Sequence, residues 1–161
     1  MTEEQTNNKP LEVLVIDDDE PIRELFHEII QSAGANVTTA IDGKDGIEKY
    51  IAKKETGVPY DAVLTDLIMP RASGVDVTRR VKELSPKTQV IVVTGFEPNS
   101  QYKALSEQLG QLKPDGILQK PITPEGLMYV VNQVKSVIEK RKIISDYQPQ
   151  PSYYKSPQPQ S

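Results

Sequence analysis

The sequence predicts an α/β fold built on a doubly wound, five-stranded parallel sheet. Short apolar runs rich in β-branched residues alternate with longer segments of helical spacing, and the alternation occurs five times in 161 residues. No hairpin turn signal joins two apolar runs, so consecutive strands are expected to be parallel and connected by helices. Parallel sheets are covered by helices on both faces, which accounts for strands that are apolar throughout.

The composition suits one globular domain and excludes several classes of function. Hydrophobic residues make up 37% and charged residues 26% of the chain, and its formal net charge of −4 argues against a nucleic-acid-binding surface. The absence of cysteine excludes disulfides, thiol catalysis and Cys-type zinc sites. The polar opening MTEEQTNNKP is no signal peptide, and no apolar run is long enough to cross a membrane. We therefore expect a cytoplasmic protein with neither a membrane nor a nucleic-acid partner.

The first strand is expected at residues 11–16, where the run LEVLVI suits a strand buried on both faces. The first helix, residues 20–34, has Pro21 in its first turn and Gly34 at its C-terminal end, where these residue types are favoured. The next two elements are a weaker strand and a rather polar helix, at residues 35–40 and 43–55.

The second half of the chain repeats the strand–helix unit three times. The predicted pairs are 60–66 with 73–84, 88–95 with 99–112, and 115–121 with 123–143. Asn99 or Ser100 is expected to cap the fourth helix. Thr123 is expected to cap the last helix, with Pro124 in its first turn.

The two ends of the chain differ from this domain in composition. Residues 1–9 form a polar lead, and the domain is expected over residues 10–144. Residues 145–161 hold four prolines among Gln, Ser and Tyr, a composition that cannot bury a core and favours disorder. This tail is interpreted as a solvated segment or linker, with a docking peptide for a partner as the alternative.

The predicted sheet brings four groups of side chains to one edge. In such folds the ligand crevice lies beyond the carboxyl ends of the strands. The groups are Asp17-Asp18-Asp19 after the first strand, Asp66 after the third, Thr94 after the fourth and Lys120 after the fifth. Adjacent carboxylates repel one another, so we expect the acids to reach water or to share a cation.

These residue types predict a magnesium site with phosphoryl chemistry. Clustered carboxylates offer the oxygen ligands that Mg²⁺ prefers, and no His or Cys lies near the motifs to favour zinc. A carboxylate can attack phosphorus to form an acyl phosphate, and phosphoryl transfer then needs mainly positioning and charge neutralisation. Lys120 and Thr94 would supply the charge and a hydrogen bond.

Each residue also has a purely structural interpretation. Asp17 and Asp18 could cap the following helix, and Asp66 could be a loop acid before a turn. Thr94 could be an ordinary β-former, and Lys120 a solvated lysine. His27 has no partner motif and is interpreted as a surface or packing residue, not a ligand or phosphodonor.

Four motifs together carry a resemblance to a known family. The segments VLVIDDDEP, AVLTDLIMP, VIVVTG and GILQKP occur in order at successive strand ends. Over residues 10–140 the chain resembles the receiver domain of bacterial two-component response regulators, of the chemotaxis-regulator type. The resemblance implies a flavodoxin-like (βα)5 fold with strand order 2-1-3-4-5.

The resemblance also implies a role for each residue of the predicted site. Asp66 would accept a phosphoryl group from the phosphohistidine of a sensor histidine kinase or phosphotransfer protein. Mg²⁺ would be held by carboxylates and by the backbone carbonyl of Ile68, and the acyl phosphate would contact Thr94 and Lys120. The carboxylate ligands would be Asp17, Asp18 and Asp66. The Lys120-Pro121 bond would be cis, and Asp19 would face water near the first helix's N-terminus.

The chain departs from the family pattern at several positions. Ile117 stands where an aromatic residue often reports activation, and Arg71-Ala72-Ser73-Gly74 replaces a more acidic loop. The interval from Thr94 to Lys120 is 26 positions, longer than is usual, so the fourth helix or its flanking loops should be extended and could form an unusual partner surface. Apolar Ile68 and Phe96 should shield the acyl phosphate from water and make self-dephosphorylation slow.

We expect a stand-alone receiver, not a conventional enzyme, in which phosphorylation switches a protein-interaction face made of the fourth helix, fifth strand and fifth helix. The alternative is the N-terminal receiver fragment of a longer transcription factor or output enzyme. A phosphatase of the haloacid dehalogenase type is a third interpretation, since DDD satisfies its DxD motif. The downstream partner and the oligomeric state do not follow from the sequence.

Overall fold

The computed structural model describes residues 9–95 and 101–146, with backbone only at residues 142 and 144–146. Five parallel strands form one sheet in the order β2-β1-β3-β4-β5, as predicted. The strands are β1 (Glu12–Ile16), β2 (Asn36–Ala40), β3 (Ala62–Asp66), β4 (Gln89–Thr94) and β5 (Gly116–Gln119). The helices are α2 (Glu20–Ser32), α3 (Gly43–Glu55), α4 (Gly74–Leu84), α5 (Lys103–Leu112) and α6 (Pro124–Asp146).

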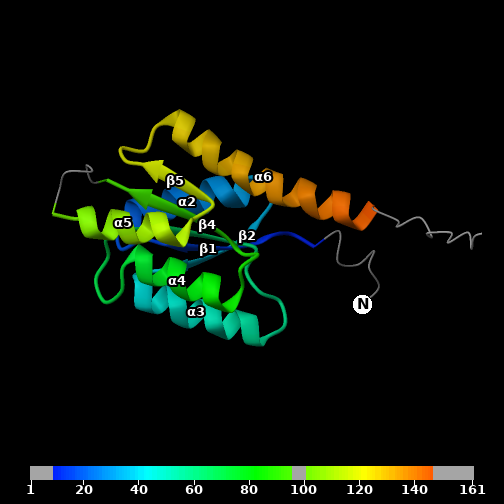
Figure 1. The fold of residues 1–161 in the computed structure, drawn as a ribbon. Coiled ribbons are helices and arrows are strands. Elements are labelled where there is room, and N and C mark those ends of the chain that lie inside the picture. The colour runs from blue at the N-terminus through cyan, green and yellow to red at the C-terminus, as the bar shows by residue number, and fades with distance from the viewer. Residues whose placement is uncertain (1–8, 96–100, 147–161) are drawn as a thin grey trace, which may run out of the picture.

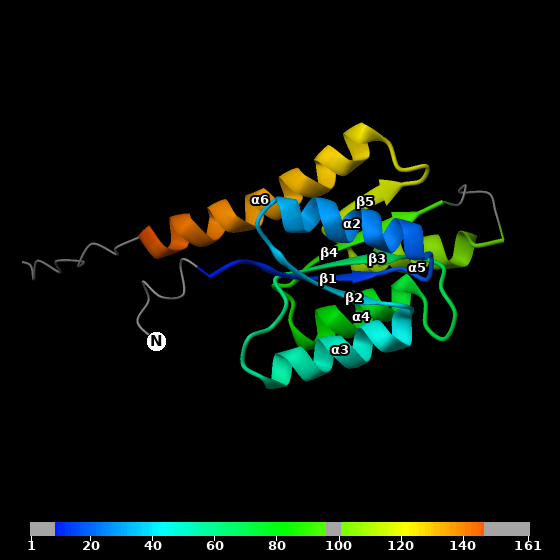
Figure 2. The same cartoon turned by 180° about the vertical axis from the view of Figure 1, so that it is seen from behind.

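The helices cover both faces of the sheet, and each face has its own hydrophobic core. Helices α2 and α6 lie on one face, and α3, α4 and α5 lie on the other (Figures 1 and 2). On the first side Phe26 and Ile30 of α2 pack with alternate strand residues and with α6. On the second side the core includes Tyr50 of α3 and Val77 of α4. Because both faces of β1, β3 and β4 are buried, the middle residues of these strands are apolar on both sides of the sheet.

Local signals explain several of the helix ends. Pro21 lies in the first turn of α2, and Gly34 follows that helix with a positive φ of 97°, which glycine adopts without steric cost. Ser73 and Asp76 form a reciprocal capping box at α4. The Thr123 hydroxyl accepts a hydrogen bond from the backbone N–H of Gly126, which confirms Thr123 as the cap of α6.

Two predicted helix boundaries, the start of α5 and the end of α6, differ from the structure by more than two residues. Helix α5 begins at Lys103 and not at residue 99, and the proposed caps Asn99 and Ser100 lie outside the described residues. Cap-forming residue types mark where a helix can begin. The residues of this helix that pack on the core begin only at Leu105. The helix has 10 residues, so it is not extended, and the long interval after Thr94 lies in its flanking segments.

Helix α6 runs to Asp146, two residues into the segment that was expected to be tail. The first proline of that segment is at position 149, so nothing in the sequence obliges the helix to stop before Asp146. The rest of the predicted tail and most of the predicted lead lie outside the described residues. Within the described ranges, none of the helices has the length and apolarity that crossing a bilayer requires.

Gly74 allows α4 to start directly against the end of β3, and this contact gives the first testable prediction. A Cβ atom at Gly74 would clash with the carbonyl oxygen of Asp66 and would lie 2.8 Å from Cα of Leu67. Both are backbone atoms that cannot move aside cheaply. Gly74→Ala should therefore lower the free energy of unfolding by about 1–3 kcal/mol, measured by urea denaturation.

Gly110 provides the matched control. It lies inside α5, and a Cβ atom added there would have nothing within 4 Å, so Gly110→Ala should raise stability by about 0.5–1 kcal/mol. Equal effects of the two substitutions would contradict the close contact at Gly74.

Candidate functional site

Three carboxylates meet at the carboxyl edge of the sheet. Asp17 and Asp18 follow the last residue of β1, and Asp66 is the last residue of β3. One carboxylate oxygen from each lies within 4.8 Å of the others. Asp17 and Asp66 are buried, with 2% and 8% of their surfaces exposed, whereas Asp18 is exposed. The structure thus brings together the acids that the sequence placed at this edge.

Lys120 supplies the positive charge next to this cluster. Its Nζ lies 3.5 Å from Oδ2 of Asp66 and 3.8 Å from Oδ2 of Asp17. The backbone N–H of Lys120 donates to the carbonyl of Thr94 at 2.7 Å, which fixes the residue at the end of β5. The Lys120-Pro121 peptide bond is cis, as predicted.

Backbone groups orient the two buried carboxylates. Oδ1 of Asp66 accepts the N–H of Leu67 at 2.9 Å, and Oδ1 of Asp17 accepts the N–H of Asp19 at 2.9 Å. Asp19 itself occupies the cap position of α2, is exposed, and makes no side-chain cap hydrogen bond. Asp19 therefore lies near the helix N-terminus as predicted, and the alternative of Asp17 or Asp18 as the cap residue of α2 is wrong.

Thr94 completes the edge. The sheet register pairs Asp66 with Val93 and Thr94 with Gln119, so Thr94 lies between the strand ends that carry Asp66 and Lys120. Its hydroxyl oxygen is buried and has no hydrogen-bond partner among the described residues. Burying a hydroxyl without a hydrogen-bond partner costs free energy. An oxygen-bearing ligand that bound at this edge could accept a hydrogen bond from Thr94 and remove that cost.

Burial makes the cluster difficult to ionise. Loss of hydration raises the pKa of Asp17 to about 6, and the neighbouring charges of Asp66 and Asp18 act in the same direction. Loss of hydration also raises the pKa of Asp66, against the opposing effect of Lys120. One ammonium group cannot neutralise three carboxylates, so the site favours an additional cation.

The donor set fits a hard divalent metal ion. Asp17, Asp18 and Asp66 offer only oxygen atoms, the ligands that Mg²⁺ prefers while it keeps several of its waters. Ile68 follows Asp66 by two residues and lies in the loop at this edge, with its side chain 36% exposed. Its backbone carbonyl remains a predicted ligand.

Sequence reasoning missed the ion pair between Asp42 and Arg71, which lie in the loops after β2 and β3 at the same edge of the sheet. Asp42, at the start of α3, is buried and accepts hydrogen bonds from its own helix and from Arg71 in the loop after β3. The signal was present in the sequence, because an acid directly before Gly43-Lys44-Asp45 suits a helix cap. Nothing in the sequence indicated that Arg71 would be its partner.

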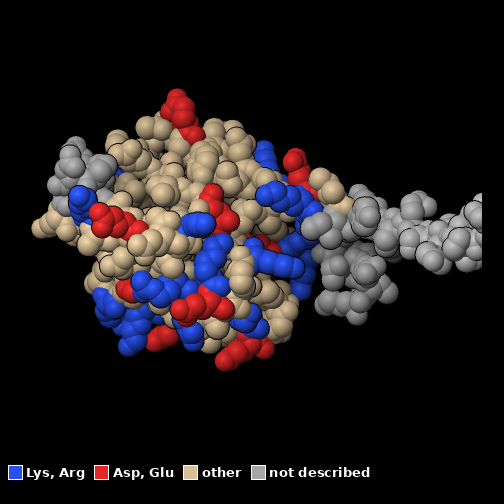
Figure 3. Space-filling model, viewed as in Figure 1, with Lys and Arg blue, Asp and Glu red and all other residues tan. Residues whose placement is uncertain are grey.

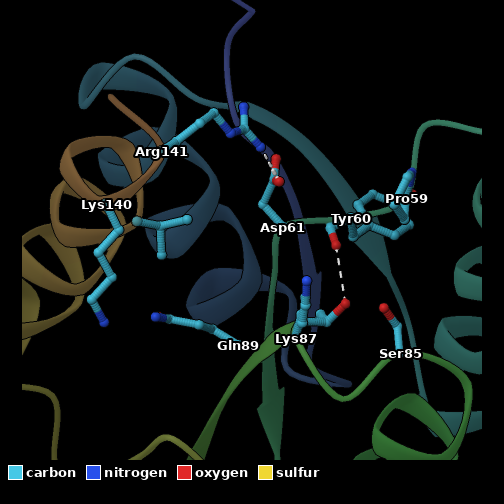
Figure 4. A pocket seen from close by; sticks show the side chains of 10 residues that line it. Pro59, Tyr60, Asp61, Ser85, Lys87, Gln89, Lys140 and Arg141 are labelled. Carbon is cyan, nitrogen blue, oxygen red and sulfur yellow. Dashed lines mark hydrogen bonds and ion pairs between the residues drawn. The ribbon is translucent and has the colours of Figure 1, made fainter. Parts of the chain in front are cut away.

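A shallow groove of about 420 Å³ lies at the opposite edge of the sheet, at the amino ends of β3 and β4. Tyr60, Asp61 and Gln89 line it together with the last turns of α6, from which Arg141 points to Asp61 (Figure 4). Lys and Arg side chains gather at this end of the molecule (Figure 3). The groove and the acidic cluster therefore lie at opposite ends of the strands.

Comparison with known proteins agrees with this geometry. The family model for the response regulator receiver domain matches residues 13–132. The chain belongs to the response regulator receiver family. The alternative of a haloacid dehalogenase phosphatase is therefore wrong. Receiver domains are phosphoacceptor domains of two-component signalling and act with histidine kinases or phosphotransfer proteins.

Individual relatives are similar at a moderate level. The sensor kinase/phosphatase LuxN of Vibrio campbellii is 31% identical over 127 residues, which are 79% of this chain and 14% of LuxN. The chemotaxis protein CheY of Treponema pallidum is 34% identical over 94 residues, 58% of this chain and 63% of that protein. The receiver chain spans between 8% and 35% of the length of the first curated relatives that it matches.

Solved receiver structures have the same fold. The receiver domain of AraT from Geobacillus stearothermophilus superimposes with a TM-score of 0.68 at 28% identity, covering 83% of this chain and 99% of that one. The chemotaxis regulator CheY4 of Vibrio cholerae gives a TM-score of 0.63 at 26% identity, covering 78% and 99%.

The buried charge of Asp17 in the receiver domain gives the second prediction. Asp17→Asn keeps the oxygen that accepts the Asp19 N–H but removes a carboxylate whose pKa burial has raised from 3.8 to about 6. In metal-free protein near pH 7 the substitution should raise the free energy of unfolding by about 1–3 kcal/mol.

The pH dependence of this difference has a definite sign. A carboxyl group with a raised folded-state pKa destabilises the protein when ionised, and the penalty disappears as pH falls through 6 toward 3.8. The advantage of Asp17→Asn should therefore shrink from about pH 7 to about pH 4 in thermal unfolding with chelator present. Asp19→Asn, at the exposed neighbour, is the control. An advantage that is constant with pH would contradict the electrostatic origin.

Proposed function

We propose that Asp66 accepts a phosphoryl group from the phosphohistidine of a sensor histidine kinase or phosphotransfer protein. The observation that carries this proposal is the Lys120 ammonium 3.5 Å from the Asp66 carboxylate, next to a Thr94 hydroxyl that has no partner among the described residues. A carboxylate nucleophile, a cation and a free donor are the groups that transfer to an aspartate requires.

The transfer forms one bond and breaks one. A carboxylate oxygen of Asp66 attacks phosphorus, the phosphorus–nitrogen bond of the donor breaks, and the imidazole keeps the electron pair and takes a proton. Lys120 stands where it can neutralise charge on the phosphoryl oxygens, and Thr94 can donate to one of them. The Leu67 N–H holds Oδ1 of Asp66, which limits rotation of the carboxylate.

Asp17, Asp18, Asp66 and the Ile68 carbonyl would hold Mg²⁺. When bound, the ion supplies positive charge that offsets the carboxylates and the incoming phosphoryl group. Asp18 is exposed and suits direct ligation, while buried Asp17 can act partly through a bound water.

Phosphorylation would redistribute the contacts of Lys120 and Thr94. In the unphosphorylated protein Lys120 spans Asp66 and Asp17, and its N–H is bonded to the Thr94 carbonyl. A phosphoryl dianion on Asp66 would compete for both side chains and shift the end of β4 relative to β5. The interaction face proposed to respond is formed by α5, β5 and α6. Ile117 of β5 is 54% exposed on this face. It occupies the position where receivers often have an aromatic residue that responds to activation.

The domain is proposed to act in the cytoplasm, as receivers typically do, and to signal as a stand-alone protein. The second candidate is the N-terminal receiver of a longer transcription factor or output enzyme. It is supported by several relatives that are much longer than this chain, which spans 14% of one and 35% of another. The length of the native open reading frame distinguishes the two.

Intact mass spectrometry tests the phosphoacceptor. Incubation with acetyl phosphate and Mg²⁺ should add one phosphoryl group to the wild-type protein, and chelator should prevent it. Asp66→Ala should lose the adduct completely, because Asp66 is the carboxylate that β3 presents to Lys120. Asp19→Asn removes a neighbouring exposed acid and should keep the adduct. A wild-type protein without an adduct, or an adduct retained in Asp66→Ala, would refute the assignment.

The lifetime of the adduct is a separate prediction. Ile68 is apolar, and Phe96, which lies outside the described residues, is the second residue proposed to shield the acyl phosphate from water. Self-dephosphorylation should therefore be slow, and Ile68→Asn should shorten the half-life by about tenfold, a barrier change of about 1.4 kcal/mol. Ile117→Asn introduces the same change at another exposed isoleucine and should leave the half-life unchanged. A wild-type half-life of seconds would count against shielding.

A further inference from the structure

Arg71 has an unusual backbone conformation beside the proposed site. Its φ of 67° lies in the left-handed region, which disfavours residues with a Cβ and is found mainly for Gly, Asn and Asp. Such a conformation persists only where surrounding contacts stabilise it, and it is enriched near functional sites. The contacts of the Arg71 side chain therefore need an explanation.

The side chain of Arg71 makes a two-nitrogen contact with Asp42. Nε and Nη2 lie 2.7 Å and 2.6 Å from Oδ2 of Asp42. The other oxygen of Asp42 accepts the N–H of Asp45 at 2.8 Å and so caps α3. Asp42 is only 5% exposed, so its position is fixed by the helix and it offers Arg71 a rigid anchor.

The backbones of the two loops also touch. A Cβ at Gly43 would clash with the carbonyl oxygen of Ala72, so the first residue of α3 packs directly on the loop that holds Arg71. The contact and the ion pair are adjacent in both segments. Together they tie the loop between β3 and α4 to the start of α3.

The same loop contains the predicted metal ligand. Leu67 and Met69 are buried and anchor its first half in the core, with Ile68 exposed between them. Its second half turns back through hydrogen bonds from Ala72 to Pro70 and from Gly74 to Leu67. Arg71 is at the apex of this turn, and its ion pair with Asp42 joins the turn to a different element of the fold.

We infer that Arg71 is a positioning residue for the metal site: through buried Asp42 it holds the β3–α4 loop in the conformation that presents the Ile68 carbonyl beside the acidic cluster. This role rests on the proposed function. The role is assigned through the loop because two of the three guanidinium nitrogens of Arg71, Nε and Nη2, contact Asp42. Groups behind a metal ligand commonly affect metal affinity by tenfold or more.

Two substitutions separate positioning from general stability. Arg71→Gly removes the ion pair while keeping the left-handed backbone easy to adopt. Asp42→Asn removes the negative charge but keeps a side-chain oxygen that can cap α3. Both should weaken Mg²⁺ binding about tenfold. Arg71→Lys, which keeps the charge without the fork of nitrogens, should recover part of the affinity.

The experiment is a Mg²⁺ titration of each 161-residue protein, followed by the amide NMR shifts of residues 67–69 and 71–73. Arg79→Ala is the control, since it removes a cation paired with Asp76 on the exposed side of α4 and should bind Mg²⁺ as the wild type does. Thermal unfolding of each metal-free variant is measured alongside, and Arg71→Gly is expected to lose affinity without a matching loss of stability.

The outcomes are distinct. Weaker Mg²⁺ binding by Arg71→Gly and Asp42→Asn, with Arg79→Ala unchanged, supports the positioning role. Wild-type affinity in both variants overturns it, even if they unfold at lower temperature, and leaves the proposed function standing. A wild-type protein that binds no Mg²⁺ overturns the proposed function and this role together.

Discussion

The structure depends on holding two like-charged carboxylates, Asp17 and Asp66, in a buried position at the edge of a parallel sheet. Left alone they would repel and draw in water, yet both are almost completely enclosed. Among the described residues, the ammonium of Lys120 is the one cation that forms an ion pair with both, at 3.8 Å from Asp17 and 3.5 Å from Asp66. Because this compensation is incomplete, the edge is electrostatically unfavourable in the metal-free protein. Buried, incompletely neutralised carboxylates of this kind are typical of functional sites, which often lower the stability of the folded protein.

The rest of the fold makes that arrangement rigid. The registers of β1, β3, β4 and β5 place four strand ends at the same level, so the side chains that follow them cannot separate without disrupting the sheet. Two hydrophobic layers, one on each face, hold these strands. The burial of these apolar side chains stabilises the fold and offsets the repulsion between Asp17 and Asp66. Close contacts at Gly43 and Gly74 then bring the neighbouring loops against the site without intervening side chains.

The alternation of strands and helices was enough to predict the clustering of Asp17, Asp18, Asp66 and Lys120 and the position of Thr94, because strand ends in a parallel sheet have fixed relative positions. The strand order followed from the resemblance to receiver domains and is confirmed. Sequence reasoning placed α3 correctly at both ends. It misplaced the start of α5, because residues that can cap a helix occur before the point where the helix begins. It misplaced the end of α6, because the first helix-breaking proline of the tail lies only at position 149.

The pairing of Arg71 with Asp42 was not predictable in the same way. Those residues are 29 positions apart, and neither follows a sheet position that fixes its neighbour. Their contact depends on the path of two loops and on a left-handed backbone angle at a residue that rarely adopts one. Loop geometry of this kind is set by tertiary packing, and a pattern of residue types does not encode it.

Helix α6 begins four residues after Lys120, and its last turns line the groove at the opposite edge of the sheet. With 23 residues it is a rod of about 34 Å, at a rise of about 1.5 Å per residue. A tilt of about 5° around one end of such a rod moves the other end by about 3 Å. The ion pair of Arg141 with Asp61 and its hydrogen bond to the Lys9 carbonyl lie where that displacement would be largest. In mechanical terms α6 is a lever: its first turn follows Lys120 closely, and its last turns are held by the contacts of Arg141.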